Sequence, residues 1–418
     1  MIKKVHKQDL RLGMFIHDLN CGWMDHSFLR NSFMLRKEAD LEKIAKSGIT
    51  EVYIDTIKGI DVLDSAEAPS QAEVAQQIEE KILHSPVVGA PPPEVRTTHQ
   101  EEMVFAKEIQ KEANKVIHSI LEDVRMGKRI AVERVEPVVS QITDSILRNP
   151  GTLVSLCRIR EGDTYTFQHS VSVATLLISF CRAMELPPET IHEAGVGGML
   201  HDIGKMRVPD HILNKPGKLT DAEFVIMKNH VNLGLEVLEK TPNISRTVIQ
   251  IAGEHHEKFC GTGYPARKKG AEISLLGRMA AIVDVYDAIT SNRIYHKGME
   301  PPLALRKIYE WSDASATTEP HMDEELVQHF IHALGIYPVG SLVRLESQRL
   351  AVVLDQSHEG LLTPRLRVMY DCRSRKKIEP FDLDLAAPEN GADAIVGNED
   401  PDDWKVSPFE YLDIPKIG

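Results

Sequence analysis

The chain has 418 residues, and 49 lysines and arginines against 62 aspartates and glutamates give it a formal net charge of −13. At about 100–200 residues per domain, this length predicts two or three folded units. The acidic balance excludes a protein that coats a DNA or RNA polymer, because neutralising many phosphates needs a large basic face, but it allows a small anion in a local pocket.

The first 63 residues predict a small α+β domain. Strand-like runs at residues 14–17 and 51–54 enclose a helix-like stretch from Leu35 to Lys46, which stops before Gly48. The composition then changes at residues 64–100, which are rich in Pro, Ala, Ser and Gln. Such a composition is typical of a linker between domains.

Apolar residues recur at helical spacing from residue 101 to about 335, so this part of the chain predicts a helical domain. From residue 336 the pattern changes to four short β-prone runs separated by turn residues, followed by an acidic tail. We expect the tail to be held where Trp404, Phe409 and Tyr411 dock. The sequence therefore predicts a β-rich appendage for residues 336–418 and a mainly α fold for the whole chain.

The sequence shows neither a signal-peptide-like stretch nor an apolar run near the length of about 20 residues that spans a bilayer. Its five cysteines are scattered and lack a CxxC pair, which is typical of reduced thiols. We therefore expect a cytoplasmic protein without a membrane span.

A set of histidines and aspartates lies on apolar helical faces, at intervals of about 25–32 residues. Each alone would be interpreted as a hydrogen-bonded core residue. Burial of the whole set is unfavourable, because burying so many ionisable groups without a cation costs several kcal/mol per charge. The residues are His169, His201, Asp202, His230, His255, His256 and Asp284, with His230 expected on the helix that a T-x-x-E capping box opens at Thr220.

A metal site would remove that cost. Imidazole and carboxylate ligands without cysteine suit Fe, Mn, Ni, Co or Zn. A carboxylate such as Asp202 can bridge two divalent transition metal ions, which lowers the pKa of a shared water and makes hydroxide at neutral pH.

The motifs around these residues resemble those of a known protein family. His201-Asp202 resembles the HD phosphohydrolase superfamily, and the further strings narrow the resemblance to HD-GYP domains. These strings are HDIGK at 201–205, ILNKPGKLT at 212–220, HHEKFCGTGYP at 255–265, Asp284, and SNRIY at 291–295. The resemblance covers about residues 145–335 and implies an all-helical catalytic core that hydrolyses cyclic di-GMP, a bacterial second messenger, at a site with two or three metals.

The resemblance also implies roles for particular residues. The seven histidines and aspartates correspond to the metal ligands of the family, with Asp202 as the bridging carboxylate. Lys205 resembles the phosphate-binding lysine, whereas Arg293, and more weakly Lys297, resemble a basic pair that binds the second phosphate. Gly263, Tyr264 and Pro265 form the namesake loop, in which the tyrosine either lines the pocket or supports the loop.

Two positions depart from the family pattern. Members with three metals have a glutamate four residues before the first histidine ligand, where this chain has Tyr165. We therefore expect two metals. Cys260 stands where an aspartate usually precedes the GxGYP loop, and we expect it to tune the loop.

The expected function is a phosphodiesterase that converts cyclic di-GMP to linear pGpG, with GMP left open as a further product. A hydroxide that bridges the metals would attack phosphorus, while Lys205 and Arg293 bind the phosphate oxygens. Residues 201–300 hold 14 basic and 12 acidic residues, so this region is slightly basic inside an acidic chain. Bound metal would make it more so.

Two alternatives stay open. One is a cyclic di-GMP receptor or scaffold with little turnover that docks diguanylate cyclases. The other is an HD hydrolase of a different cyclic dinucleotide. The N-terminal domain resembles the uncharacterised domain that often precedes HD-GYP domains, and we expect it to have a sensory or docking role.

Overall fold

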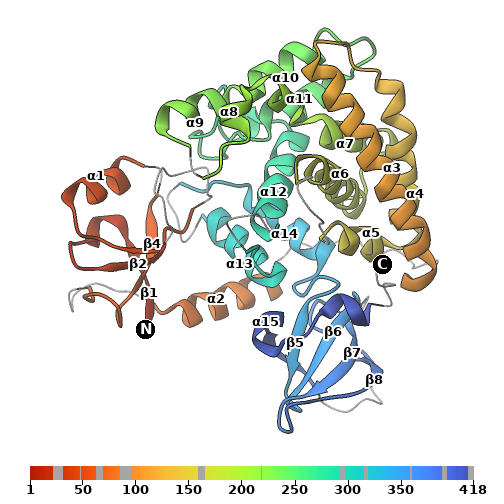
Figure 1. Ribbon diagram of the computed structural model, residues 1–418. Helices are drawn as coiled ribbons and strands as arrows, with labels where there is room; N and C mark the ends of the chain where they lie inside the picture. Colours follow the sequence, from red (N-terminus) through yellow and green to blue (C-terminus); the bar gives the residue numbers. More distant parts are fainter. Residues whose placement is uncertain are drawn as a thin grey trace.

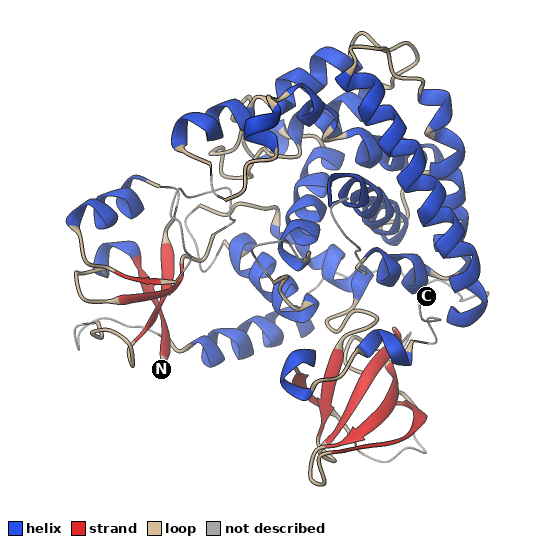
Figure 2. Cartoon of the chain, in the orientation of Figure 1, coloured by secondary structure: helices blue, strands red, loops and turns tan. Residues whose placement is uncertain are grey.

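A body of helices fills the middle of the computed structural model, and the two ends of the chain each form a small antiparallel sheet beside it (Figure 1, Figure 2). This architecture confirms the predicted mainly α fold with a small α+β unit at the N-terminus and a β unit at the C-terminus. The structure describes residues 1–21, 32–47, 49–62, 69–84, 97–158, 165–217, 219–291, 297–314, 319–357, 360–387 and 393–412.

The N-terminal sheet is antiparallel and has the strand order β1-β4-β2-β3. Alternate side chains of these short strands point to one face, where Ile16 and Ile54 pack with Ile44 of a helix. All three are at most 1% exposed, so the unit has a core of its own. The elements are β1 (Ile2–His6), β2 (Phe15–Asp18), β3 (Phe33–Met34), α1 (Glu38–Lys46) and β4 (Glu51–Asp55).

Part of the segment predicted as a linker is a helix, α2 (Gln71–Leu83). Ser70 and Glu73 form a capping box at its start, and Val74, Ile78 and Ile82 recur every four residues. These three side chains are buried in the main apolar cluster of the helical body. Because alanine and glutamine are also good helix formers, a linker-like composition does not exclude a packed helix.

The helical body is built around α6, which is apolar on all sides and therefore buried. Its Leu177 and Phe180 belong to one apolar cluster, whereas Ala174 and Ile178 belong to the second. No helix among the described residues is both long and apolar enough to cross a bilayer. The helices are α3 (His99–Arg125), α4 (Glu136–Arg148), α5 (Pro150–Cys157), α6 (Tyr165–Ala183), α7 (Pro188–Leu200), α8 (Asp210–Leu213), α9 (Asp221–Lys228), α10 (His230–Leu238), α11 (Arg246–Glu254), α12 (Leu275–Thr290), α13 (Pro301–Ser312) and α14 (Glu324–Leu334).

The C-terminal sheet has the order β8-β7-β6-β5-β9, and both of its faces are covered. Val343 and Val353 point into the helical body, while Leu350 and Val352 point to the other face. The predicted aromatic residues of the tail pack on that second face. The four predicted runs are strands, and a fifth, β9, was not predicted. The elements are β5 (Leu342–Leu345), β6 (Arg349–Asp355), β7 (Arg365–Asp371), β8 (Lys376–Asp384), β9 (Ile395–Asn398) and α15 (Pro401–Trp404).

Candidate metal centre

The seven histidines and aspartates singled out in the sequence meet at one point inside the helical body. His169 lies on α6, His201-Asp202 follow α7, His230 begins α10, His255-His256 follow α11, and Asp284 lies on α12. Every one of these side chains is at most 9% exposed. Five packed elements therefore hold a buried cluster of imidazoles and carboxylates.

Glycines let the elements approach closely enough to form this cluster. A Cβ on Gly204 would lie 1.9 Å from the carbonyl oxygen of His230, so the backbone after Asp202 packs directly on the start of α10. A Cβ on Gly198 would lie 2.7 Å from Cα of Ala174, which brings α7 against α6. At both positions any larger residue would push the histidines apart.

The placement of His230 corrects one prediction. The capping box at Thr220 and Glu223 is present, but the helix it opens, α9, ends at Lys228. Asn229 separates α9 from α10, and His230 is the first residue of α10. Its Nδ1 still lies 2.8 Å from the carbonyl oxygen of Met227. His230 therefore stays next to the last turn of α9, the helix on which the sequence predicted it.

Backbone carbonyls fix the imidazoles in one orientation. Nδ1 of His201 lies 2.8 Å from Gly198 O, and Nδ1 of His255 lies 2.9 Å from Ala252 O. With the similar contact of His230, three imidazoles donate a proton from Nδ1 to the preceding turn. Each then presents Nε2 to the centre, and the neutral ring, without a proton on this atom, is the form of imidazole that binds a metal.

These Nε2 atoms surround the carboxylate of Asp202, and its two oxygens face different sides. Oδ1 lies 3.3 Å from Nε2 of His230 and 3.8 Å from Nε2 of His255. Oδ2 lies 3.3 Å from Nε2 of His201 and 3.5 Å from Nε2 of His169. Asp202 is thus placed between two sets of imidazoles.

The ligand atoms divide into two groups, each within 4.8 Å. One contains Asp202, His230, His255 and His256, and the other contains His169, His201 and Asp284. Within the described residues, several of these buried atoms make no hydrogen bond, namely Nε2 of His201, His230, His255 and His256 and Oδ1 of Asp202. Buried polar atoms without partners are costly, so the residues present fit a metal site.

Asp287 supports the cluster from behind and was not predicted. Its Oδ2 lies 2.6 Å from Nδ1 of His169, whose Nε2 lies 2.9 Å from Oδ1 of Asp284. A carboxylate behind a ligating imidazole fixes the ring and increases its basicity. The signal was available, because Asp287 follows Asp284 by three residues and so shares its face of α12.

The electrostatics of the cluster centre on its two carboxylates. Burial alone would raise the pKa of Asp202, but Lys205 and His201 hold it well below its usual range. Burial likewise opposes charge on His201, yet Asp202 and Asp284 raise its pKa to about 10. Burial next to His201 lowers the pKa of His255 to about 3, so His255 keeps a neutral imidazole.

The three basic candidates have different placements. Lys205 lies in the 3₁₀ turn after Asp202, and its ammonium contacts Oδ2 of that carboxylate at the edge of the cluster. Lys297 is turned to the C-terminal unit, where it pairs with Asp400 at 2.8 Å and with Asp402. Arg293 lies outside the described residues, as does the side chain of Tyr165.

The loop with Gly263, Tyr264 and Pro265 covers one side of the cluster. The ring of Tyr264 lies 4.7 Å from the ring of His256, so the tyrosine faces the candidate metal ligands. A Cβ on Gly263 would lie 2.3 Å from the backbone nitrogen of Lys258, which explains the glycine. Cys260 lies 3.0 Å from the hydroxyl of Thr262, a contact inside the loop.

Two buried glutamates, missed in the sequence, hold this loop in place. Glu257 accepts hydrogen bonds from the backbone nitrogens of Ala266 at 2.7 Å and Lys268 at 3.1 Å. Glu254 pairs with the ammonium of Lys268 at 2.5 Å. The HHE string therefore has a structural glutamate directly after the two histidine candidates.

A pocket of about 670 Å³ opens beside the cluster. His255, His256 and Asp284 form its inner end, and Tyr264 forms part of its side. The rest is largely apolar, with Val285, Ile289, Trp311 and Met322, together with His321. A polar end with an apolar side suits a ligand that carries both a phosphate and an aromatic base.

Comparison with known proteins agrees with this geometry. A family model described as "HD domain" matches residues 157–315, and one described as "Domain of unknown function (DUF3391)" matches residues 2–135. The chain is 41% identical over 414 residues to a protein named cyclic di-GMP phosphodiesterase PA4108 from Pseudomonas aeruginosa. That alignment covers 99% of this chain and 95% of the relative.

Two further similarities are more limited. A 3′3′-cGAMP-specific phosphodiesterase 2 from Vibrio cholerae is 39% identical over 33% of this chain and 26% of its own length. A solved structure of Bd1817, an HDG"Y"P protein from Bdellovibrio bacteriovorus, covers 80% of this chain and 99% of its own at a TM-score of 0.47 and 18% identity.

Proposed function

The chain belongs to the HD-GYP family of HD-domain proteins, and from this we propose that it is a metal-dependent phosphodiesterase that hydrolyses cyclic di-GMP. Support comes from the full-length similarity to a protein of that name and from the cluster described above. The proposal extends to two metal ions, held by the seven clustered histidines and aspartates.

One observation carries the proposal of two ions, namely the position of Asp202. Its two carboxylate oxygens face different imidazole sets, with His230 and His255 on one side and His169 and His201 on the other. A single ion would leave buried Nε2 atoms without a partner, either those of His230 and His255 or that of His201. Two divalent ions would satisfy both sets and supply Lewis acidity and a nucleophile at neutral pH.

The protein's own groups then have separate tasks. Lys205 lies at the edge of the cluster and is 22% exposed, and we assign its ammonium to a phosphate oxygen of the substrate. The buried imidazoles exclude bulk water from the inner end. Tyr264, packed on His256, limits the space over the cluster and positions the phosphodiester at that end.

The substrate assignment rests on the pocket and on the relatives together. The apolar residues beside the cluster provide a surface for a purine, and the inner end provides the phosphate site. The relative named for 3′3′-cGAMP aligns over a third of this chain, so a mixed cyclic dinucleotide is the second candidate substrate. Linear pGpG is the proposed first product.

The alternative of a receptor with little turnover concerns the same site. A receptor needs the pocket but not a complete cluster, and every proposed ligand is present here. This completeness favours an enzyme. Docking of diguanylate cyclases through the N-terminal domain remains part of the receptor alternative.

The proposal is tested with the full-length chain loaded with manganese or ferrous iron under reducing conditions. Cyclic di-GMP and 3′3′-cGAMP are supplied separately, and chromatography follows the cyclic dinucleotide, pGpG and GMP over time. Elemental analysis of the same sample gives the metal content. We expect cyclic di-GMP to be lost at the higher rate, with pGpG formed first and two metal ions per chain.

The outcomes separate the candidates. Metal-loaded protein that binds cyclic di-GMP but leaves it intact in single-turnover experiments would favour the receptor. Faster loss of 3′3′-cGAMP would assign the mixed dinucleotide. A chain that neither binds nor cleaves either compound would contradict the proposal.

A further inference from the structure

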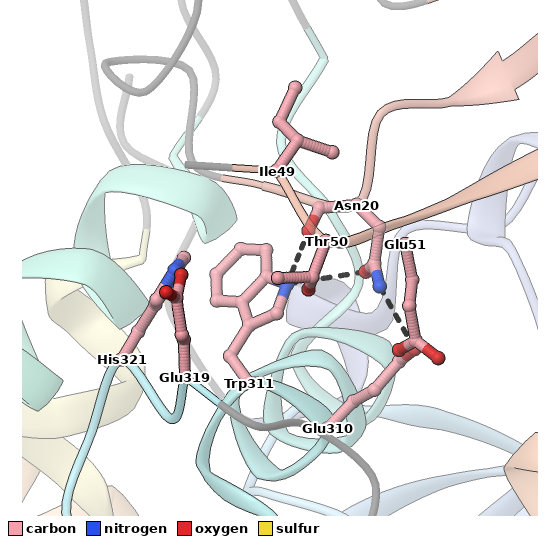
Figure 3. Close-up of a pocket in the computed structure, with 8 residues that line it drawn as sticks. All are labelled: Asn20, Ile49, Thr50, Glu51, Glu310, Trp311, Glu319 and His321. Carbon is pink, nitrogen blue, oxygen red and sulfur yellow. Dashed lines mark hydrogen bonds between the residues drawn. The ribbon is translucent and has the colours of Figure 1, made fainter. Parts of the chain in front are cut away.

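Trp311 lies between the candidate active site and the N-terminal domain. Trp311 lines the pocket that ends at His255, His256 and Asp284. It also lines a second, smaller pocket of about 300 Å³, whose other residues include Asn20, Thr50 and Glu51 of the N-terminal domain (Figure 3). The same residue therefore borders both the candidate active site and a domain of unassigned role.

Asn20 holds the indole in place. The Nε1 proton of Trp311 is donated to the backbone oxygen of Asn20 at 2.9 Å, with the side-chain oxygen of Asn20 at 3.2 Å (Figure 3). The backbone of Asn20 is left-handed, with a φ of 51°, which asparagine tolerates better than most residues. That conformation directs its carbonyl group at the helical domain.

The neighbouring Glu310 ties the two domains together at the same point. Its buried carboxylate accepts hydrogen bonds from Nδ2 of Asn20 at 3.0 Å and from the hydroxyl of Tyr53 at 3.0 Å. It also pairs with the ammonium of Lys4 at 2.8 Å. Three groups of the N-terminal domain therefore satisfy the carboxylate of Glu310.

Backbone hydrogen bonds continue from Trp311 to the loop over the cluster. The nitrogen of His321 donates to Trp311 O at 2.8 Å, and the nitrogen of Phe259 donates to His321 O at 2.8 Å. Gly270 N in turn donates to Phe259 O at 3.0 Å, which closes the loop that carries Tyr264. Trp311 and His321 both line the active-site pocket on the way.

We infer that Trp311 contacts the purine of the bound nucleotide, and that Asn20 of the N-terminal domain is its positioning residue. On this inference the N-terminal domain completes the substrate pocket of the helical domain through one tryptophan. The inference rests on the proposed function, since it assigns a part of the same pocket. Through Asn20 and Trp311, the N-terminal domain would directly affect the affinity of the pocket for its substrate.

The physical basis is aromatic stacking on a held surface. Stacking of a base on an aromatic side chain is worth about 1–3 kcal/mol by alanine substitution, which corresponds to roughly 5- to 150-fold in affinity. An indole that is free to change rotamer loses part of that gain, because binding must then order it. The hydrogen bond to Asn20 removes this cost before the substrate arrives.

The test is a double-mutant cycle with Trp311→Ala and Asn20→Gly in the full-length, metal-loaded chain. Glycine tolerates the left-handed backbone and removes both the Oδ1 contact to the indole and the Nδ2 contact to Glu310. The backbone acceptor of residue 20 remains, but it loses the side-chain contact that anchors it to the helical domain. We expect Trp311→Ala to raise KM for cyclic di-GMP by roughly 5- to 150-fold. We expect Asn20→Gly to raise KM about threefold or more, with a smaller effect on kcat.

The cycle distinguishes positioning from general loosening. If Asn20 acts through Trp311, then Asn20→Gly has no further effect on KM in the Trp311→Ala background. Glu79→Gln is the matched control, because Glu79 pairs with Arg306 of α13 at 3.1 Å without contacting the indole. We expect this control to leave KM unchanged, and all variants to keep the wild-type metal content.

The results separate this inference from the proposed function. Wild-type protein that cleaves cyclic di-GMP, combined with an unchanged KM in Trp311→Ala or an Asn20→Gly effect that persists without the tryptophan, overturns the inference alone. A wild-type chain without turnover contradicts the proposed function, and the same cycle is then run on the dissociation constant of cyclic di-GMP. Additive effects on that constant also overturn the inference.

Discussion

Oδ2 of Asp287 lies 2.6 Å from Nδ1 of His169, and this contact orients the first histidine of the cluster from behind. Both side chains are buried, at 5% and 3% exposure. His169 differs in this respect from His201, His230 and His255, whose Nδ1 atoms face backbone carbonyls. A side chain can be changed without disturbing the backbone, so this ligand candidate is open to a specific test.

We expect Asp287→Asn to weaken metal binding or the rate of cyclic di-GMP hydrolysis by about 10- to 100-fold. The asparagine keeps the shape of the side chain but loses the charge that orients and polarises the imidazole. Metal affinity is measured by competition with a chelator, and the rate at saturating metal. Asp287→Asn protein with wild-type affinity and wild-type rate would contradict a role for this contact.

Asp202→Ala should abolish both metal loading and hydrolysis. The substitution removes the carboxylate that lies between the two imidazole sets, so neither proposed ion keeps its shared ligand. Elemental analysis of the purified variant measures the loss. Asp210→Ala is the control, because Asp210 is exposed and pairs with Arg125 at the surface. Two ions per chain in Asp202→Ala would show that the ligand assignment is wrong.

Lys205→Ala should keep the metals and lose rate. Its ammonium lies at the edge of the cluster and is proposed to bind a phosphate oxygen, and loss of one such donor typically costs about 10²- to 10³-fold in kcat. Lys215→Ala is the matched control, because Lys215 pairs with Glu223 on α9 at 2.5 Å. Loss of metal from Lys205→Ala would place the lysine among the groups that assemble the cluster.

The residues of the cluster could be predicted because each one breaks a local pattern. His169 lies in line with buried Val173 and Leu177, and Asp284 lies inside an apolar helix. A buried histidine or aspartate at such a position needs an explanation. Because five helical segments show the same anomaly, a single metal site explains all of them. The apolar spacing that predicts the helices also predicts the face of each helix on which these residues lie.

Other features depend on contacts between distant parts of the chain, and no local pattern reports them. Lys297 pairs with Asp400 and Asp402, about a hundred residues later, so its sequence neighbourhood could not show that it turns to the C-terminal unit. Trp311 resembles any core tryptophan until the N-terminal domain is placed against it. The short strand β9 gave no signal, since Gly397 interrupts it and its residues are only partly buried or exposed.

Gly204→Ala should destabilise the protein, because the new Cβ would meet the carbonyl oxygen of His230 at 1.9 Å and the nitrogen of Gly234 at 2.3 Å. Both neighbours are backbone atoms, so relief requires α10 to move. We expect a loss of about 1–3 kcal/mol or more in the free energy of unfolding, measured on metal-free protein by urea denaturation. Gly397→Ala, whose Cβ would meet nothing within 4 Å, should change it by about 0.5 kcal/mol or less. Equal stabilities of the two variants would contradict this account.

The contact between Asp18 and Lys307 should make the stability of the domain interface depend on pH. Burial alone would raise the pKa of Asp18, but the Lys307 ammonium and the backbone N–H of Asn20, at 2.9 Å, hold it below its usual range. A carboxyl group with a lowered pKa in the folded state stabilises the fold above its unfolded pKa of about 3.9. This contribution is lost as the pH falls from there through the folded-state pKa.

Asp18→Asn should therefore be less stable than the wild type at pH 6–7, by roughly 1.5–3 kcal/mol, the typical worth of a hydrogen bond to a charged group. The difference should shrink as the pH falls below about 4, because Asp18 of the unfolded chain then takes up a proton and the folded-state carboxyl group follows at lower pH. Urea denaturation of both proteins between about pH 2.5 and 7 gives the two curves. In a Lys307→Met background the lysine that lowers the pKa is absent, so the pH dependence of the difference should be weaker. A difference that stays constant or grows on acidification would show that Asp18 contributes through packing rather than through its charge.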